Sequence, residues 1–108
     1  MKKKYVKPTM KMGINDTACF CTHPGFITRE IAGELLLVPI GEQTKTLNGM
    51  ITFSETGAFI LKHLDGHTNV YKIARLLAEE CDENIETVLP DVRIFLHNAL
   101  MNNLIISI

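Results

Sequence analysis

The chain has 108 residues, of which 46% are apolar, so we expect one small globular domain with a compact core rather than a disordered chain. The net charge is -1, but five lysines lie among the first eleven residues, at positions 2, 3, 4, 7 and 11. The rest of the chain is therefore acidic and lacks the basic face that nucleic-acid binding requires. This composition argues against DNA or RNA as a partner.

The sequence gives no sign of a membrane or secreted protein. No apolar run approaches the roughly 20 residues of a membrane span, and polar residues follow the basic start where a signal peptide would be apolar. Three cysteines are an odd number, which fits reduced thiols better than a disulfide framework. We predict a cytoplasmic protein that does not bind membranes.

The first part of the chain has no regular hydrophobic pattern. Residues 1–23 show no helical or strand period, so we predict a flexible N-terminal tail before a folded domain at 24–108. Cys19, Cys21 and His23 place three soft ligands on one side of an extended segment, which could form part of a zinc site. A closed site needs a fourth ligand, and the remaining thiol, Cys81, lies in a predicted helix. Free thiols are the favoured interpretation, and we predict no metal and no cofactor.

Residues 26–53 have the pattern of a small sheet. Apolar and polar residues alternate up to Ile31, Ala32 and Gly33 form a turn, and a second apolar run ends at Pro39, so residues 26–40 predict a β-hairpin. A polar connection at 41–49 leads to a third short strand at 50–53. The result is a three-stranded antiparallel sheet, which must cover its apolar face with helices.

Three helices are predicted after this sheet. Ser54 caps the first, which runs towards Gly66, and Thr68 or Asn69 caps an amphipathic second helix. The short link between them suggests a helix-turn-helix and, with the strands alongside, a winged helix. The fold class is therefore α+β: a winged helix-turn-helix, with a three-stranded antiparallel sheet followed by three helices.

The third helix begins near Asn84 and has two unusual features. Pro90 lies within it and costs about 3 kcal/mol in a helix interior, so we expect a kink or a break near residues 86–89. One apolar stripe is predicted to be buried and consists of Ile85, Val88, Val92, Phe95 and Ala99. A second apolar line includes Ile94 and Met101 and is flanked by Leu89, Pro90, His97 and Leu100. This line could contact another part of the chain, a second copy in a homodimer, or a ligand in a groove, and the pattern leaves these alternatives open.

An ordered series of short motifs resembles the PqqD family over residues 26–105. The motifs are G-E-L-L-L-V-P-I-G at 33–41, S-E-T-G-A-F-I at 54–60, L-D-G at 64–66, D-V at 91–92, F-L at 95–96 and N-L-I at 103–105. The chain has Phe53-Ser54 where the family often has Leu-Asn, and Asn103 where it often has Gly. Asn also tolerates a left-handed backbone, so the second change is mild.

The resemblance implies a non-catalytic RiPP recognition element. Such a module captures the leader of a ribosomally synthesised precursor peptide as an added strand and presents it to a modifying enzyme, commonly a radical S-adenosylmethionine enzyme. Transferred to this chain, the peptide-binding residues are Gly49, Met50, Ile51, Thr52 and Phe53 on the strand and Pro90, Ile94, His97 and Met101 on the helix. Edge-strand amides and carbonyls would supply affinity, and side-chain pockets would supply selectivity.

Two other classes of function were weighed against this one. A winged-helix DNA-binding regulator is the main alternative, but its recognition helix would carry Arg75 alone among arginines, and the last helix only Arg93. An enzyme would need a base beside a nucleophile, whereas the histidines are scattered. Asp65 and Asp91 fit helix ends and solvated faces better than direct contact with a peptide.

The lysine-rich start is extended in character and offers spaced apolar side chains. Residues 3–14 could occupy the peptide groove of their own chain or that of a second copy, because tethering raises their effective concentration to about the millimolar range. A disordered tail is the favoured alternative, since lysine-rich termini usually lack structure.

Overall fold

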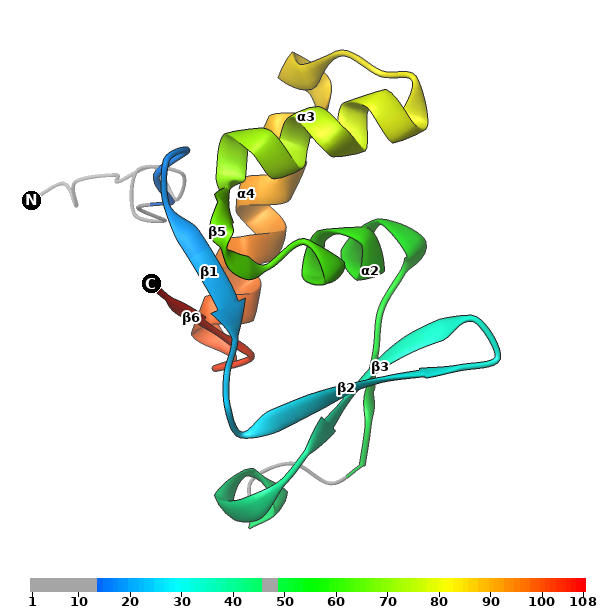
Figure 1. Ribbon diagram of the computed structural model, residues 1–108, viewed down its shortest axis with the longest axis vertical. Helices are drawn as coiled ribbons and strands as arrows, with labels where there is room; N and C mark the ends of the chain where they lie inside the picture. The colour runs from blue at the N-terminus through cyan, green and yellow to red at the C-terminus, as the bar shows by residue number, and fades with distance from the viewer. Residues whose placement is uncertain (1–13, 46–48) are drawn as a thin grey trace, which may run out of the picture.

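The computed structural model describes residues 14–45 and 49–108. Within these ranges the chain forms six strands, three α-helices and one short 3-10 helix, η1 (Gly41–Lys45). The strands make two separate three-stranded antiparallel sheets, with the strand orders β2-β3-β4 and β5-β1-β6. The fold is α+β as predicted, and Figure 1 shows the β2-β3 hairpin lying below α2.

The predicted sheet is confirmed as β2 (Phe26–Ile31), β3 (Glu34–Pro39) and β4 (Ile51–Thr52). The β2-β3 register runs without interruption from the Phe26 and Pro39 pair to the Ile31 and Glu34 pair. Ala32 and Gly33 between them have φ values of 53° and 83°, the positive values that a tight two-residue hairpin turn needs. Strand β4 pairs with β3 through two residues only, so it is shorter than the predicted strand at 50–53.

Side-chain caps start the first two helices. Ser54 Oγ accepts a hydrogen bond from the amide of Gly57 at 3.2 Å and begins α2 (Glu55–Lys62). Asn69 Oδ1 accepts one from the amide of Lys72 at 2.8 Å and begins α3 (Val70–Cys81). Of the two caps that the sequence allowed for this helix, Asn69 is therefore the one used.

The third helix, α4 (Ile85–Met101), continues through Pro90, so the break allowed for at 86–89 does not occur. Proline there removes one hydrogen bond to the carbonyl four residues earlier. The buried residues on either side of Pro90 hold the helix together, because Val88 packs before it and Val92, Leu96 and Ala99 pack after it. Burial of this stripe outweighs the single lost hydrogen bond.

The segment before β2 differs from the sequence prediction, which placed residues 1–23 in a flexible tail. Residues 19–22 instead form β1 (Cys19–Thr22), the central strand of the second sheet, between β5 (Asp65–Asn69) and β6 (Ile105–Ser107). Phe20 is only 3% exposed and belongs to the hydrophobic core. The folded part therefore begins well before residue 24, while residues 1–13 lie outside the described residues.

Polar contacts also fix the chain just before β1. The Arg93 guanidinium donates Nε to Asp16 Oδ1 at 2.9 Å and Nη2 to Asp16 Oδ2 at 2.8 Å. These hydrogen bonds lower the pKa of Asp16 and raise the pKa of Arg93. The amide of Val70 donates to the carbonyl of Ala18 at 3.0 Å, which joins the start of α3 to the residue before β1. Both contacts connect residues far apart in the sequence.

The core lies between the two sheets and the three helices. Its most deeply buried large side chains come from five elements: Leu37 from β3, Ile60 from α2, Val70 and Ile73 from α3, Val92 and Leu96 from α4, and Ile105 from β6. These elements therefore share one hydrophobic core.

Candidate functional site

The predicted peptide edge corresponds to β4, which lies at one end of the β2-β3-β4 sheet. Among the described residues β4 pairs with β3 alone, so its other side is an open edge. Met50 before the strand is 58% exposed and Thr52 is exposed, whereas Ile51 and Phe53 are half-buried against the core. The strand thus alternates between a solvent-facing and a core-facing side while one row of its backbone groups stays available.

The predicted helix residues lie on one face of α4, on which Pro90, Ile94 and Met101 are exposed and His97 is half-buried. Pro90, Ile94, His97 and Met101 are spaced by four, three and four residues, which places them one above the other along the helix. Ile94 is 44% exposed and Met101 is 68% exposed, although both are large and apolar. This face lies opposite the buried stripe of α4. No described element covers Ile94 or Met101.

A ring contact links the end of β4 to α4. The rings of Phe53 and Phe95 meet edge to face, with centroids 6.1 Å apart and an interplanar angle of 62°. Gly57 makes room for Phe95, because a Cβ on Gly57 would lie 2.9 Å from Cε1 of that ring. Phe95, which the sequence assigned only to the buried stripe, is therefore the residue that brings the strand end and the helix together.

The two halves of the predicted site are neighbours but do not converge on one point. At roughly 100° per residue, Ile94 lies a little more than a quarter turn round the helix from Phe95. Pro90, His97 and Met101 lie further round the helix. Of the four predicted helix residues, Ile94 is therefore the nearest in angle to Phe95, which contacts Phe53. A groove that includes all nine predicted residues stays a prediction.

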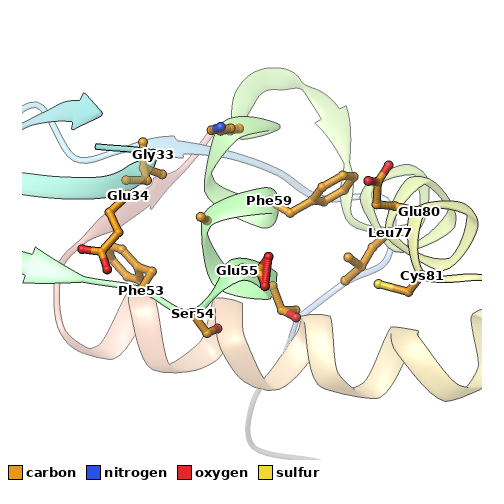
Figure 2. A pocket seen from close by; sticks show the side chains of 13 residues that line it. Gly33, Glu34, Phe53, Ser54, Glu55, Phe59, Leu77, Glu80 and Cys81 are labelled. Carbon is orange, nitrogen blue, oxygen red and sulfur yellow. The ribbon is translucent and has the colours of Figure 1, made fainter. Parts of the chain in front are cut away.

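A pocket that the sequence did not predict lies next to Phe53 and has a volume of about 760 Å³. Its floor is the outer face of α2, formed by Glu55, Ala58, Phe59 and Lys62, and we call it the α2 trough. Figure 2 shows Glu34 and Phe53 on one side of α2, and Leu77, Glu80 and Cys81 on the other. One wall is therefore the β2-β3 turn, and the opposite wall is the end of α3.

The candidate metal ligands and catalytic residues lie in ordinary structural surroundings. His23 Nδ1 accepts a hydrogen bond from the amide of Gly25 at 2.8 Å, and Cys19 and Cys21 are half-buried free thiols in β1. Across residues 14–45 and 49–108 no group of three or more His, Cys, Asp or Glu side chains is arranged to hold a metal ion. His63 Nδ1 lies 2.8 Å from the carbonyl of Phe59, one turn earlier in the chain.

Asp65 organises the turn between α2 and α3. Its carboxylate accepts hydrogen bonds from the amides of His67 and Thr68 and from Thr68 Oγ1, at 2.8, 2.8 and 3.0 Å. These donors, the two amides foremost, lower the pKa of Asp65 from 3.8 to about 2. Asp65 therefore has a structural role at the start of β5, and it would be a poor proton donor or acceptor near neutral pH.

The surface of α3 does not resemble a DNA-reading helix. Lys72 and Arg75 are exposed near its start, but residues 79–86 carry five carboxylates and no basic residue. Those carboxylates would repel a phosphate backbone. No helix within the described ranges has the length and hydropathy to cross a membrane.

Comparison with known protein families shows to which family this chain belongs. A family model described as coenzyme PQQ synthesis protein D (PqqD) matches residues 34–105, more than half of the 108 residues. The chain belongs to the PqqD family. No curated protein and no solved structure gives a significant match. The PqqD match begins at the start of β3 and ends in β6, so it includes β4, α2, α3 and α4 but neither β1 nor β2.

Proposed function

We propose that this PqqD family member is a non-catalytic peptide-binding module. It captures the leader of a ribosomally synthesised precursor peptide by strand addition and presents it to a modifying enzyme of the radical S-adenosylmethionine class. The observation that carries the proposal is the open edge of β4 beside the exposed apolar face of α4. The helices and the hairpin would have the winged-helix arrangement that the family resemblance implies.

Strand addition suits the chemistry of β4. An incoming extended peptide satisfies the unpaired backbone groups on the open side of the strand, which gives affinity without strict sequence demands. Met50 beside the edge and Ile94 on α4 offer apolar contacts to alternate side chains of such a peptide. A few buried contacts of this kind suffice for micromolar binding, which corresponds to about -8 kcal/mol.

A peptide bound through its leader would leave its other residues free to reach an enzyme. Only the leader needs to lie on β4, so the segment to be modified extends away from this small domain. Met101, at the far end of the helix face, is 68% exposed and could contact either the peptide or the enzyme. A homodimer through the same face is the competing use of this surface, and sedimentation of the free protein would detect it.

Proline substitutions in β4 test the proposal. In an antiparallel pair, neighbouring residues alternate between pointing their N–H groups at the partner strand and away from it. One of Ile51→Pro and Thr52→Pro therefore removes a hydrogen bond to β3, and the other removes only an outward N–H. We expect the outward variant to keep its circular dichroism spectrum and to lose binding, measured by calorimetric titration with the short peptides encoded beside its gene.

The outcome separates the edge from other docking sites. If both proline variants fold and bind those peptides as tightly as the parent protein, strand addition at β4 is wrong. If the parent protein binds none of the encoded peptides, the assignment of a leader as its ligand is wrong.

A further inference from the structure

The lining of the α2 trough has three carboxylates and one basic side chain. Glu34, Glu55 and Glu80 line it, and none of the three forms a salt bridge with another described residue. The one basic residue of the lining, Lys62, already donates to Glu30 Oε2 at 2.9 Å. The trough therefore presents three carboxylates to whatever enters it.

The same trough has an apolar lining between these carboxylates. Leu35, Phe53, Ala58, Phe59 and Leu77 contribute to its walls and floor. Figure 2 shows the ring of Phe59 extending from α2 towards Leu77 and Glu80. A surface that combines apolar contacts with carboxylates fits lysine and arginine side chains, which pack their methylene stems on apolar groups and place their charge at the rim.

The trough is continuous with the proposed strand-binding edge. Phe53 follows β4 directly and also lines the trough, and Ser54 and Glu55 lead from one to the other. A peptide that pairs antiparallel with β4 has its N-terminal side at the Phe53 end of the strand. Its residues before the paired segment would therefore pass Phe53 and reach the carboxylates.

We infer that the α2 trough binds a basic segment of the precursor peptide, with lysine or arginine residues on the N-terminal side of the residues that add to β4. This inference rests on the proposed function and adds a charge preference to it. The partner is selected by charge complementarity, since three unpaired carboxylates attract cations and disfavour acidic peptides. Four further carboxylates in residues 79–86, at positions 79, 82, 83 and 86, extend the negative field beyond the Glu80 wall and would favour the approach of a basic chain.

The test uses a library of random short peptides displayed on phage and selected on the full chain. We expect the selected peptides to contain an alternating apolar segment with lysine or arginine before it. One such peptide is then synthesised together with a version in which glutamine replaces each basic residue. We expect the glutamine version to bind about tenfold more weakly, because exposed charge pairs contribute modestly and add over several contacts.

Matched protein variants locate the effect. The triple variant Glu34→Gln, Glu55→Gln, Glu80→Gln should lose about tenfold in affinity for the basic peptide and leave that of the glutamine peptide unchanged. The control variant Glu79→Gln, Glu83→Gln, Glu86→Gln changes the net charge equally outside the trough and should have a smaller effect. An equal loss in both variants would show general attraction only and would overturn the inference.

A position-specific readout comes from Cys81, an exposed free thiol on the trough wall. The bound basic peptide should slow alkylation of Cys81 by N-ethylmaleimide, whereas the glutamine peptide at equal saturation should slow it less. Equal protection by both peptides would contradict a basic segment in the trough.

The arms of the experiment separate the two proposals. Selected peptides that lose binding to the β4 proline variants but carry no basic residues would refute the trough inference and leave the proposed function intact. Peptides that are insensitive to those proline variants would refute the proposed function itself. If replacing Lys2, Lys3, Lys4, Lys7 and Lys11 by glutamine in the full chain removes the effect of the triple variant, the occupant is the chain's own N-terminal segment, and an incoming precursor is wrong.

Discussion

The two sheets of this protein each have three strands, but one is built from consecutive segments of the chain and the other from distant ones. Strands β2, β3 and β4 follow one another in the chain, and two of them form a hairpin with a two-residue turn. Strands β5, β1 and β6 come from the middle, the beginning and the end of the described chain. The first sheet offers an open edge next to the trough, whereas the second joins distant segments. We therefore expect substitutions in the first to affect binding most, and substitutions in the second to affect stability most.

The largest expected effect is on stability, at the centre of the non-local sheet. Phe20 is 3% exposed, and Phe20→Ala should lower the free energy of unfolding by about 3–5 kcal/mol because it leaves a cavity among several elements. Urea unfolding would measure this loss. Ile31→Ala, at a position 55% exposed in β2, is the control and should cost less than about 0.5 kcal/mol. A cost for Phe20→Ala as small as that of the control would mean that β1 does not belong to the core.

This contrast also explains which parts of the fold the sequence could predict. The hairpin, α2, α3 and α4 have local signals, such as alternation up to Ile31, the turn at Ala32 and Gly33, and caps at Ser54 and Asn69. Strand β1 has four residues and β6 has three, too few for a period to be recognised. Strand β5 consists of Asp, Gly, His, Thr and Asn; three of these, Asp, Gly and Asn, are depleted in strands, and the segment is extended here through pairing with β1.

The candidate site shows the same division. The sequence indicated the edge at residues 50–53 and the exposed line of Ile94 and Met101, since both depend on local spacing. It could not indicate that Phe53 meets Phe95 across Gly57, because that contact depends on how β4 and α4 pack. The α2 trough was missed for the same reason: the β2-β3 turn and the end of α3 are brought to α2 only by folding.

The second expected effect is on binding and would sharpen the comparison. Ile94→Asp and Met101→Asp place a charge on exposed apolar positions of α4. Each should weaken leader binding by about tenfold or more, and each should change the free energy of unfolding by less than about 0.5 kcal/mol. Calorimetric titration and urea unfolding measure the two quantities on the same samples. Val92→Asp, at a fully buried position, is the control that should unfold the domain; unfolding by the exposed variants as well would mean that this face belongs to the core.

A smaller effect is expected where the chain before β1 is joined to α4. Asp16 and Arg93 form a bidentate ion pair whose side chains are 33% and 39% exposed, so solvent screens much of the attraction. Asp16→Asn should lower the free energy of unfolding by about 0.5 kcal/mol at neutral pH. The folded pKa of Asp16 lies below its ordinary value of 3.8, so this contribution is present above pH 3.8 and disappears as the pH falls through the folded pKa.

Stability curves against pH for the two proteins should therefore converge in acid. The double variant Asp16→Asn, Arg93→Gln should lose no more free energy of unfolding than the two single variants lose together. The reason is that the first substitution already removes the ion pair. A difference between the parent protein and Asp16→Asn that persists at pH 2 would contradict an ionic contribution.

The smallest effect concerns the turn that leads into β5. Carboxyl chemical shifts of Asp65 in a pH titration should report a pKa of about 2, because two backbone amides and the Thr68 hydroxyl donate to the charged form. Stability that depends on Asp65 should be present above pH 3.8 and decline as the pH falls towards 2. In Thr68→Val the pKa should rise partway, since one of the three donors is lost, and an unchanged pKa would show that the hydroxyl does not stabilise the carboxylate.

The pairing of β1 with β6 has a practical consequence for attaching this protein to other objects. Phe20 lies opposite Ser107, and the amide of Ile108 donates to the carbonyl of Cys19 at 2.9 Å, so the last residue is held against the first described strand. In Figure 1 this end of the chain lies on the opposite side of the molecule from the tip of the β2-β3 hairpin. A sensor surface or a fluorescent label joined at Ile108 would therefore leave the hairpin side of the molecule facing outward.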